Sequence, residues 1–232
     1  MGERHASSGQ STISVVIPAL DEEAEVAATL RSVADADERI LVDGGSRDHT
    51  REIAQAEGVR VLTSAPSRGG QMAAGARSAT GDWLLFLHAD TRLDPGWRSA
   101  ILELPPGVAS GAFRLAIDAS GAGYRLVEAM VRLRCAVLRL PFGDQGLLVR
   151  RAAYLRVGGF APIPLLEDVD LVRRLRKAGR LVFLKERALT SPRRWRRHGL
   201  VGTTLRNWSI QALYALGVPP ERLARTYQRR RR

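Results

Sequence analysis

Short apolar runs alternate with helical patterns through the first half of the chain, and this alternation limits the fold more than any other sequence feature. The apolar runs recur about every 20–25 residues and are rich in β-branched and aromatic side chains. Because strands that alternate with helices pair in parallel through right-handed crossovers, the pattern predicts an open α/β sheet. The predicted strands are Ile13–Ile17, Arg39–Asp43, Val59–Thr63 and Trp83–His88, and the predicted helices are Glu22–Ala36, Thr50–Glu57 and Gly70–Thr80.

The second half of the chain continues with longer elements, and its length suits one full domain. We therefore predict a polar N-terminal tail at 1–12, one α/β domain at 13–192 with halves at 13–104 and 105–192, and a basic, partly helical segment at 193–232. In this half, strands are expected at Val108–Ile117, within Asp144–Arg150 and at Leu181–Leu184, and helices at Gly123–Leu140, Glu167–Ala178 and Val201–Leu216.

The net charge of +12 is concentrated at one end of the chain. Residues 193–232 contain 11 Arg and one acidic residue, whereas residues 1–192 contain 25 basic and 23 acidic residues. A local excess of arginine suits an anionic membrane surface or a diphosphate better than a duplex, so the charge disfavours a nucleic-acid partner. The single cysteine, Cys135, excludes an intramolecular disulfide framework and a multi-cysteine zinc site.

No stretch of the sequence is long and apolar enough to predict a transmembrane helix. Met1–Thr12 lacks the apolar core of a signal peptide. These features predict a cytoplasmic protein. The amphipathic pattern at 123–140 and the basic C-terminal segment further predict peripheral contact with the inner face of the cell membrane.

Polar residues follow three of the predicted strands. Pro18 to Glu22 follow the first strand, Asp43 to Ser46 end the second, and His88-Ala89-Asp90 end the fourth. Ligands of open α/β sheets bind at the C-terminal ends of the strands, so these residues predict a binding site. The first strand is not followed by a glycine-rich loop that could cradle phosphates. A bound nucleotide would then need a divalent cation, held by Asp90 and His88.

The order of the motifs resembles glycosyltransferase family 2, the inverting enzymes of the A-type nucleotide-sugar fold. The resemblance rests on the motifs at Ile17–Glu22, Val42–Thr50, His88–Asp90 and Glu167–Asp168, and it covers about residues 13–195. The details LHADT, GDQG and LLEDVDL are similar to a small bacterial subgroup, the radical-SAM/selenodomain-associated transferases. The resemblance implies a Rossmann-like fold with a mostly parallel open sheet flanked by helices.

The resemblance also implies a role for each matching residue. Glu22 and Asp43 would contact the base and ribose of the nucleotide, and Asp90 would bind the metal that bridges the diphosphate. Asp168 would be the catalytic base. Residues 13–104 would form the nucleotide-binding half and 105–192 the acceptor half. The further residues implied at the nucleotide-sugar or acceptor site are Pro18, Gly45, Ser46, Arg68, Asp144, Gln145, Glu167, Arg194 and Trp195.

Three positions depart from the family pattern. His88 stands at the first position of the D-x-D triplet, and because imidazole suits a transition metal we expect Mn²⁺ rather than Mg²⁺. Gly44 stands where the family usually has a second aspartate, which removes one base or metal contact. Ser191–Trp195 lacks the glutamine of the Q-x-x-R-W motif of processive members, which favours transfer of a single sugar over polymerisation.

These observations predict an inverting glycosyltransferase that moves one sugar from a nucleotide-diphosphate sugar to a hydroxyl or carboxyl acceptor with the aid of a divalent cation. A lipid-like acceptor, such as a carotenoid acid or a polyprenol, would suit the expected membrane contact.

Two alternatives stay open. One is a nucleotidyltransferase on a similar sheet, although Pro18–Glu23 contains no glycine. The other is a non-catalytic basic protein that binds membranes or nucleic acid, for which deletion of residues 222–232 would remove function.

Overall fold

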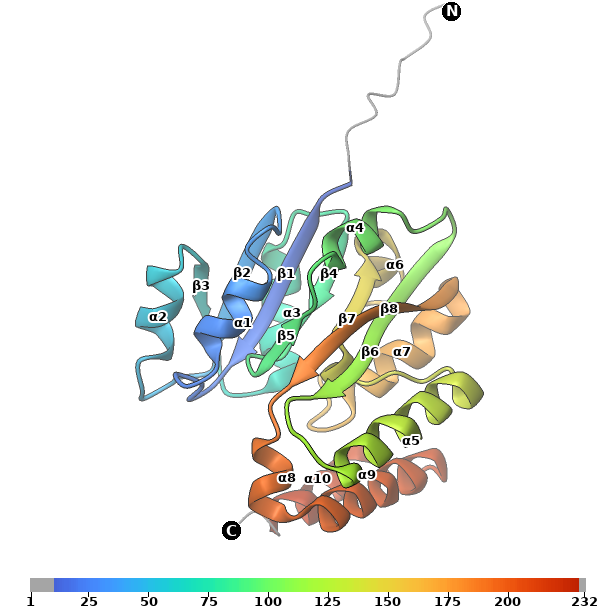
Figure 1. Cartoon of the computed structure of the whole chain (residues 1–232). Coiled ribbons are helices and arrows are strands. Elements are labelled where there is room, and N and C mark those ends of the chain that lie inside the picture. Colours follow the sequence, from blue (N-terminus) through green and yellow to red (C-terminus); the bar gives the residue numbers. More distant parts are fainter. Residues whose placement is uncertain (1–10, 230–232) are drawn as a thin grey trace, which may run out of the picture.

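The computed structural model describes residues 11–229 of the chain, with the side chains of residues 11–225. Within this range, eight strands form one sheet in the order β3-β2-β1-β4-β7-β6-β8-β5, and helices pack on both of its faces (Figure 1). The arrangement confirms the predicted α/β class, with an open sheet flanked by helices.

The first half of the sheet is parallel and largely buried. β1 (Ile13–Ala19) pairs with β2 (Glu38–Asp43) on one side and with β4 (Trp83–Phe86) on the other, and β3 (Arg60–Thr63) extends the sheet beyond β2. Successive side chains of a strand point to opposite faces, so β1 contributes to two hydrophobic cores. α1 (Val26–Ser32), α2 (Thr50–Ala56) and α4 (Trp97–Leu102) cover one face, and α3 (Arg68–Ser78), α6 (Arg151–Arg156) and α7 (Glu167–Ala178) cover the other.

α3 approaches the sheet closely through a glycine. A Cβ atom at Gly75 would lie 2.3 Å from Cγ1 of Val16 and 3.1 Å from Cγ2 of Val42. Any side chain at this position would therefore force the helix and the two strands apart.

The second half of the sheet contains the antiparallel pairs. β7 (Leu147–Arg150) runs antiparallel to β4 and to β6 (Val108–Ile117). β8 (Arg180–Thr190) is parallel to β6 and antiparallel to the edge strand β5 (Thr91–Leu93). Because Phe86 at the end of β4 pairs with Leu147 at the start of β7, the segment after β4 lies beside the segment before β7. This juxtaposition joins the two halves of the predicted site.

Several predicted ranges need correction. β6 and α7 have the predicted bounds. β8 does not end at Leu184 but continues to Thr190. This extension contains charged residues whose side chains are partly exposed, so it lacks the apolar pattern of a buried strand. The short elements β5, α4, α6 and α8 (Arg193–His198) and the ten-residue helix α10 (Pro220–Arg229) were not expected from the sequence.

The C-terminal segment packs against the domain. α8, α9 (Leu200–Ala215) and α10 lie below the sheet, close to α5 (Ala122–Leu138) (Figure 1). Trp195 and Leu200 pack with Val127 and Val131 of α5, and Leu223 of α10 is buried beside the start of α7. Arginines 230–232 of the predicted basic tail lie outside the described residues, as does most of the predicted N-terminal tail, residues 1–10.

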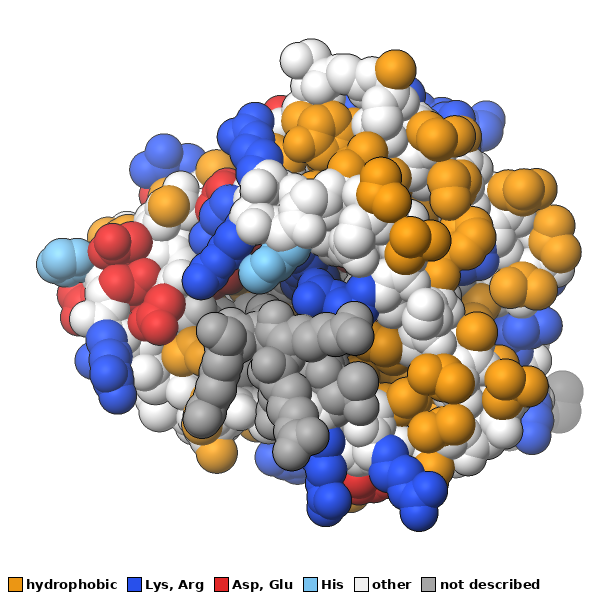
Figure 2. Space-filling model, turned by 90° about the horizontal axis from the view of Figure 1, so that it is seen from below, with side chains coloured by type: hydrophobic (Ala, Val, Ile, Leu, Met, Phe, Trp, Pro, Cys, Tyr) orange, Lys and Arg blue, Asp and Glu red, His pale blue; other side chains and the backbone are white. Residues whose placement is uncertain are grey.

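None of the described helices is both long enough and apolar enough to cross a bilayer. Figure 2 views the molecule from the end at which α8, α9 and α10 lie, and hydrophobic side chains gather over a broad part of this surface.

Candidate functional site

Hydrogen bonds join the loops that follow β1 and β2. The backbone N–H of Asp21 donates to Ser46 Oγ at 3.0 Å, and the N–H of Arg47 donates to Asp21 Oδ1 at 2.8 Å. The N–H of Glu22 donates to Thr50 Oγ1 at 2.8 Å. These bonds place Pro18, Glu22, Gly45 and Ser46, four of the residues predicted to contact the nucleotide, at the same edge of the sheet.

Asp43 shapes the second of these loops. Its fully buried carboxylate accepts hydrogen bonds from Ser46 Oγ at 2.5 Å and from the N–H groups of Gly45 and Ser46 at 3.1 Å. The carboxylate that was expected to contact the nucleotide thus has donors within its own loop. A contact between Asp43 and a nucleotide stays a prediction.

Gln71 packs closely against Gly44, the position at which the family pattern has a second aspartate. The amide of Gln71 is buried and donates to the carbonyl oxygens of Ala19 and Val42 at 2.8 and 2.7 Å. A Cβ atom at Gly44 would lie 3.1 Å from Nε2 of Gln71. Because that amide is held by two backbone carbonyls, it cannot readily give way to a side chain at position 44.

Arg193 lies between two of the predicted carboxylates. Its Nη2 donates to Glu22 Oε2 at 2.5 Å and lies 3.5 Å from Asp90 Oδ2. Burial raises the pKa of Glu22, and the hydrogen bond from Arg193 acts against this rise. Arg193, which follows β8, thus places a positive charge beside the carboxylates of Glu22, after β1, and Asp90, before β5.

Asp168 is buried at the start of α7. Its Oδ2 accepts a hydrogen bond from the N–H of Gly143 at 2.7 Å, and its Oδ1 accepts one from the N–H of Val169 at 2.8 Å. The helix begins after Leu166, whose φ of 64° is in the left-handed region. Such a conformation is costly for a leucine, and its side chain is held by burial against Val169 and Leu223.

His88 faces Asp168 across Gly143. The position of a Cβ atom at Gly143 would be 2.9 Å from His88 Nε2 and 3.1 Å from Asp168 Oδ2, so only a glycine fits between them. His88 Nε2 is buried and has no hydrogen-bond partner within the described part of the chain. Burial holds the pKa of His88 well below its ordinary value, with the cations of Arg68 and Arg194 acting in the same direction. The imidazole is therefore neutral near pH 7.

Asp144 completes this cluster. Its Oδ1 is buried and lacks a hydrogen-bond partner among the described residues. Burial raises the pKa of Asp144, and the nearby carboxylate of Asp168 adds to the rise, while Arg134, Arg194 and Arg68 oppose it. We refer to His88, Asp144 and Asp168 as the His88 cluster.

Arg68 pairs with another predicted residue, Glu167. Its Nε donates to Oε1 of Glu167, whose side chain is almost completely buried. This ion pair ties the start of α3 to the start of α7. It holds the positive charge of Arg68 near the His88 cluster.

Two predicted side chains have structural roles. Gln145 donates to the carbonyl of Phe113 at 3.1 Å and accepts from Arg134 Nη2 at 3.0 Å. Trp195 is half-buried and packs in the small core between α5 and β6. Arg134, which also lies 3.5 Å from the centre of the Phe142 ring, was not predicted as part of the site. The arginine-rich pattern of α5 was its only sequence signal.

The two predicted metal ligands have different neighbours, since His88 faces Gly143 and Asp90 faces Arg193. Among the described residues, no three His, Cys, Asp or Glu side chains are grouped closely enough to hold a metal ion. A divalent cation that takes most of its ligands from phosphates and water needs only one or two carboxylates from the protein. Half-buried Asp90, between β4 and β5, fits such an ion, and the unpartnered Nε2 of neutral His88 is chemically able to ligate one.

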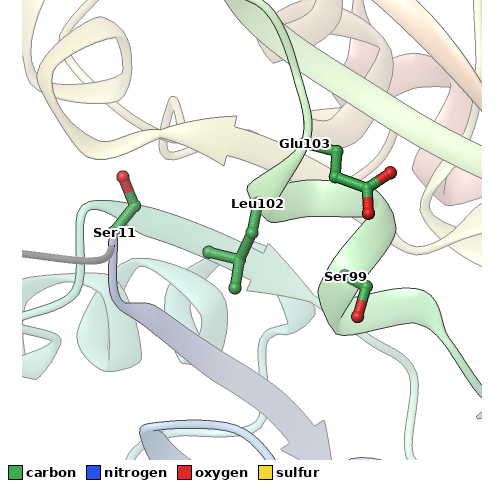
Figure 3. Close-up of a pocket in the computed structure, with 4 residues that line it drawn as sticks. All are labelled: Ser11, Ser99, Leu102 and Glu103. Carbon is green, nitrogen blue, oxygen red and sulfur yellow. The ribbon is translucent and has the colours of Figure 1, made fainter.

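A separate hollow of about 370 Å³ lies beside the start of β1, at the opposite end of this strand from the site (Figure 3). Ser11, Ser99, Leu102 and Glu103 line it. None of the residues predicted for the site is among them. The hollow is therefore not part of the candidate site.

The family model of glycosyl transferase family 2 matches residues 14–136, which are 123 of the 232 residues. The chain belongs to this family. The match ends before the loop that carries Asp144 and before α7, so it covers the strand ends with Glu22, Asp43 and Asp90 but not Asp168.

This family 2 chain is similar to glucosyl-3-phosphoglycerate synthases. It is 38% identical over 104 residues to the enzyme of Mycobacterium tuberculosis H37Rv, a match that covers 39% of this chain and 32% of the relative. With the enzyme of Mycolicibacterium smegmatis it shares 29% identity over 165 residues, which cover 60% of this chain and 54% of the relative. The chain thus matches about a third to a half of the length of these curated relatives.

Solved structures show the same fold. The M. tuberculosis synthase in complex with Mn²⁺, UDP and glucosyl-3-phosphoglycerate has a TM-score of 0.59 and 23% identity, and the match covers 90% of this chain and 81% of that one. The same synthase with Mg²⁺ and UDP has a TM-score of 0.62 and 24% identity, with 90% and 80% covered. TarS of Staphylococcus aureus, residues 1–349, has a TM-score of 0.63 at 16% identity, with 78% and 61% covered. These likenesses confirm the A-type fold of the family 2 chain.

Proposed function

We propose that this chain transfers one sugar from a UDP-sugar to an acceptor hydroxyl with inversion at the anomeric carbon. The observation that carries the proposal is the His88 cluster, in which buried His88 Nε2 and Asp144 Oδ1 have no partner within the described residues. A buried polar atom without a partner costs about 1–3 kcal/mol, so such a cluster is typical of a site that a ligand completes. The family membership and the UDP bound in the M. tuberculosis synthase support the choice of donor.

Asp168 is the residue that we assign to proton abstraction. The N–H groups of Gly143 and Val169 orient its carboxylate. A carboxylate within hydrogen-bond distance of the acceptor hydroxyl takes its proton while the oxygen forms a bond to the anomeric carbon. The bond from that carbon to the diphosphate breaks on the opposite face, and its electron pair leaves with the diphosphate. The configuration at the carbon is thereby inverted.

Fixed positive charge near the cluster would stabilise the leaving diphosphate. Arg68 and Arg194 lie close enough to influence the protonation of both His88 and Asp144. Cations that are already in place when charge develops contribute strongly to catalysis. When bound, a divalent cation held by Asp90, with His88 as a further candidate ligand, would supply additional charge neutralisation to the diphosphate. Both Mn²⁺ and Mg²⁺ are bound in M. tuberculosis synthase structures, and the preference for Mn²⁺ rests on His88.

The acceptor that we propose first is a small anionic alcohol. The M. tuberculosis synthase has been solved with phosphoglyceric acid, Mn²⁺ and UDP. In this chain, Arg134 and Arg194 lie close enough to Asp144, beside the assigned base, to oppose the rise of its pKa. Guanidinium groups are suited to binding a carboxylate or a phosphate.

A lipid-linked acceptor is the second candidate. It is favoured by α5, whose exposed side carries Leu126, Leu133 and Val137. The C-terminal end of this helix leads directly into the Phe142–Gly146 loop that contains Asp144. An acceptor that lies in an apolar phase along α5 would therefore be close to the site.

Thermal denaturation tests the donor site. We expect UDP and UDP-sugars to raise Tm when Mn²⁺ or Mg²⁺ is present, and GDP- and dTDP-sugars to raise it less. A ligand at 100 times its Kd that binds only the folded state adds about 2.7 kcal/mol of stability. If no nucleotide sugar raises Tm with either metal, the donor assignment is wrong. Transfer assays with 3-phosphoglycerate and with a polyprenyl phosphate then distinguish the two acceptors.

A further inference from the structure

α5 has two apolar sides, of which only one faces the protein. Val127 and Val131 are buried against β6 and α8. On the other side, Leu126, Leu133 and Val137 are 60–69% exposed, and their spacing of seven and four residues puts them on one stripe of the helix. A helix that only covers a core would place polar residues on this stripe.

α9 repeats this arrangement. Val201, Leu205 and Trp208 follow each other at spacings of four and three residues and are 45–68% exposed. In its 16 residues, α9 contains one charged side chain, Arg206. The two helices meet closely, because a Cβ atom at Gly123 of α5 would lie 2.5 Å from Leu200 Cδ2 at the start of α9. We refer to the six exposed residues of the two helices as the apolar face, and Figure 2 views the surface at this end of the molecule.

The two helices of the apolar face expose arginines and no carboxylates. Exposed Arg132 lies on α5 next to Leu133, and exposed Arg196 and Arg197 lie on α8 at the same end of the molecule. The acid of α5, Glu128, is buried, accepts the N–H of Ile117 at 2.7 Å and pairs with Arg125. α9 contains no acidic residue. The face thus combines apolar side chains with arginines and has no exposed carboxylate on either helix.

We propose that the apolar face binds the surface of an anionic lipid bilayer. Leucine, valine and tryptophan side chains would enter the boundary between headgroups and acyl chains, and the arginines would contact anionic headgroups. A second copy of this chain fits less well, because a two-fold contact through this face would bring its arginines together, and neither α5 nor α9 exposes a carboxylate to pair with them. The proposal concerns binding of the surface alone and does not depend on the transferase activity.

Vesicle binding by the full-length chain tests the proposal. Phosphatidylcholine vesicles are compared with vesicles that also contain phosphatidylglycerol, by flotation and by tryptophan emission. Trp83 and Trp97 are fully buried and Trp195 is half-buried against α5, so the part of the blue shift that Trp208→Phe removes reports on Trp208 itself. We expect binding to the anionic vesicles with a blue shift that is lost in Trp208→Phe, and much weaker binding to the neutral vesicles.

Two variants locate the contact. Leu133→Glu and Leu205→Glu each replace an exposed apolar side chain by a charge, and we expect each to weaken vesicle binding at least about tenfold. Leu155→Glu is the matched control, because Leu155 is equally exposed but lies on α6, away from α5 and α9, and it should bind as the unaltered chain does. Circular dichroism confirms that each variant is folded. Absence of binding to anionic vesicles, equal binding by all variants, or a dimer in sedimentation that Leu133→Glu dissociates would each overturn the proposal.

Discussion

At the scale of single residues, substitution of Asp168 gives the most direct test of the proposed reaction. We expect Asp168→Asn to lower kcat by about 10²–10⁴-fold, because an amide cannot take the proton of the acceptor. The asparagine oxygen can still accept the N–H of Gly143 while the bond from the N–H of Val169 is lost, so the fold and the affinity for UDP should be largely retained. Steady-state kinetics and calorimetric titration with UDP measure the two effects. Asp170→Asn, two residues along α7, is the control and should keep kcat; full turnover in Asp168→Asn would exclude Asp168 as the base.

Asp144 should make stability depend on pH. Its pKa is raised above the ordinary value of 3.8 in the folded state, because its carboxyl is buried. The folded state therefore binds this proton more tightly than the unfolded state, and the associated stability is lost as the pH rises through the folded pKa. We expect Asp144→Asn to stabilise the protein by about 1–2 kcal/mol at pH 7 and by less in acid. Chemical denaturation at several pH values measures this. Asp35→Asn, at an exposed position, is the control, and a gain that does not change with pH would contradict the argument.

Arg193 should compete with a cation for Glu22 and Asp90. A half-exposed guanidinium contributes modestly to such contacts, so Arg193→Gln should tighten the binding of Mn²⁺ alone by about two- to fivefold. Electron paramagnetic resonance titration of free Mn²⁺ measures the affinity without any activity assay. Arg196→Gln on the same helix is the control. Unchanged affinity in Arg193→Gln would mean that Arg193 does not occupy the place of the ion.

The sequence predicted which residues gather at the site better than it predicted their contacts. His88 was expected from a motif after a strand, Asp168 from a motif at the start of a helix and Asp144 from a turn between a helix and a strand, and the structure brings the three together. The hydrogen bonds within the Asp43 loop could not be predicted, because they depend on the conformation of Gly45 at φ 95°. Arg134 could not be predicted either, because its contact with Phe142 requires the turn between α5 and β7.

At the scale of elements, the contact of α3 with the sheet depends on Gly75. Gly75→Ala would place a methyl group 2.3 Å from Val16 Cγ1, and we expect a loss of about 1–3 kcal/mol in the free energy of unfolding. Gly202→Ala in α9 is a matched control, because nothing lies within 4 Å of the added Cβ atom there. It should stabilise the protein by up to about 1 kcal/mol through helix propensity. Urea denaturation measures both, and equal effects of the two variants would contradict the packing argument.

Hydrophobic pattern predicted most of the long elements and missed several of the short ones. β6 and α7 carry enough periodic apolar residues to define their ends. β5 and α6 are too short to show a period, since they contain three and six residues. The second half of β8 is rich in charged residues, which give no hydrophobic signal of a strand. It forms a strand because it pairs with β6 on one side and β5 on the other.

At the scale of the whole molecule, α10 connects the C-terminal segment to the site. Leu223 is buried against Leu166 and Val169, and Leu166 immediately precedes Glu167 and Asp168. We expect Leu223→Ala to cost about 2–4 kcal/mol of stability and also to lower kcat, because Leu166 loses support for its left-handed conformation. Leu216→Ala, at a largely exposed position, should change neither. Thermal denaturation and kinetics measure the two effects; loss of stability with unchanged kcat would separate α10 from the site.

The contact of Leu223 with Leu166 and Val169 affects how the result of a C-terminal deletion is interpreted. Removal of residues 222–232 was expected to distinguish a transferase from a protein that acts through its basic tail. Since the deletion also removes Leu223, a transferase should lose activity as well. Substituting exposed Arg225 leaves Leu223 in place and tests the charge alone.

The contact between Gly44 and Gln71 bears on how chains of this family diverge. An aspartate at position 44 is compatible with this backbone only if the amide at position 71 moves or is replaced by a smaller group. The two positions are 27 residues apart in sequence, Gly44 directly after β2 and Gln71 in α3, yet a change at one constrains the other. Substitutions at 44 and 71 should therefore be interdependent, with Gly44→Asp tolerated in the presence of Gln71→Ala and harmful without it.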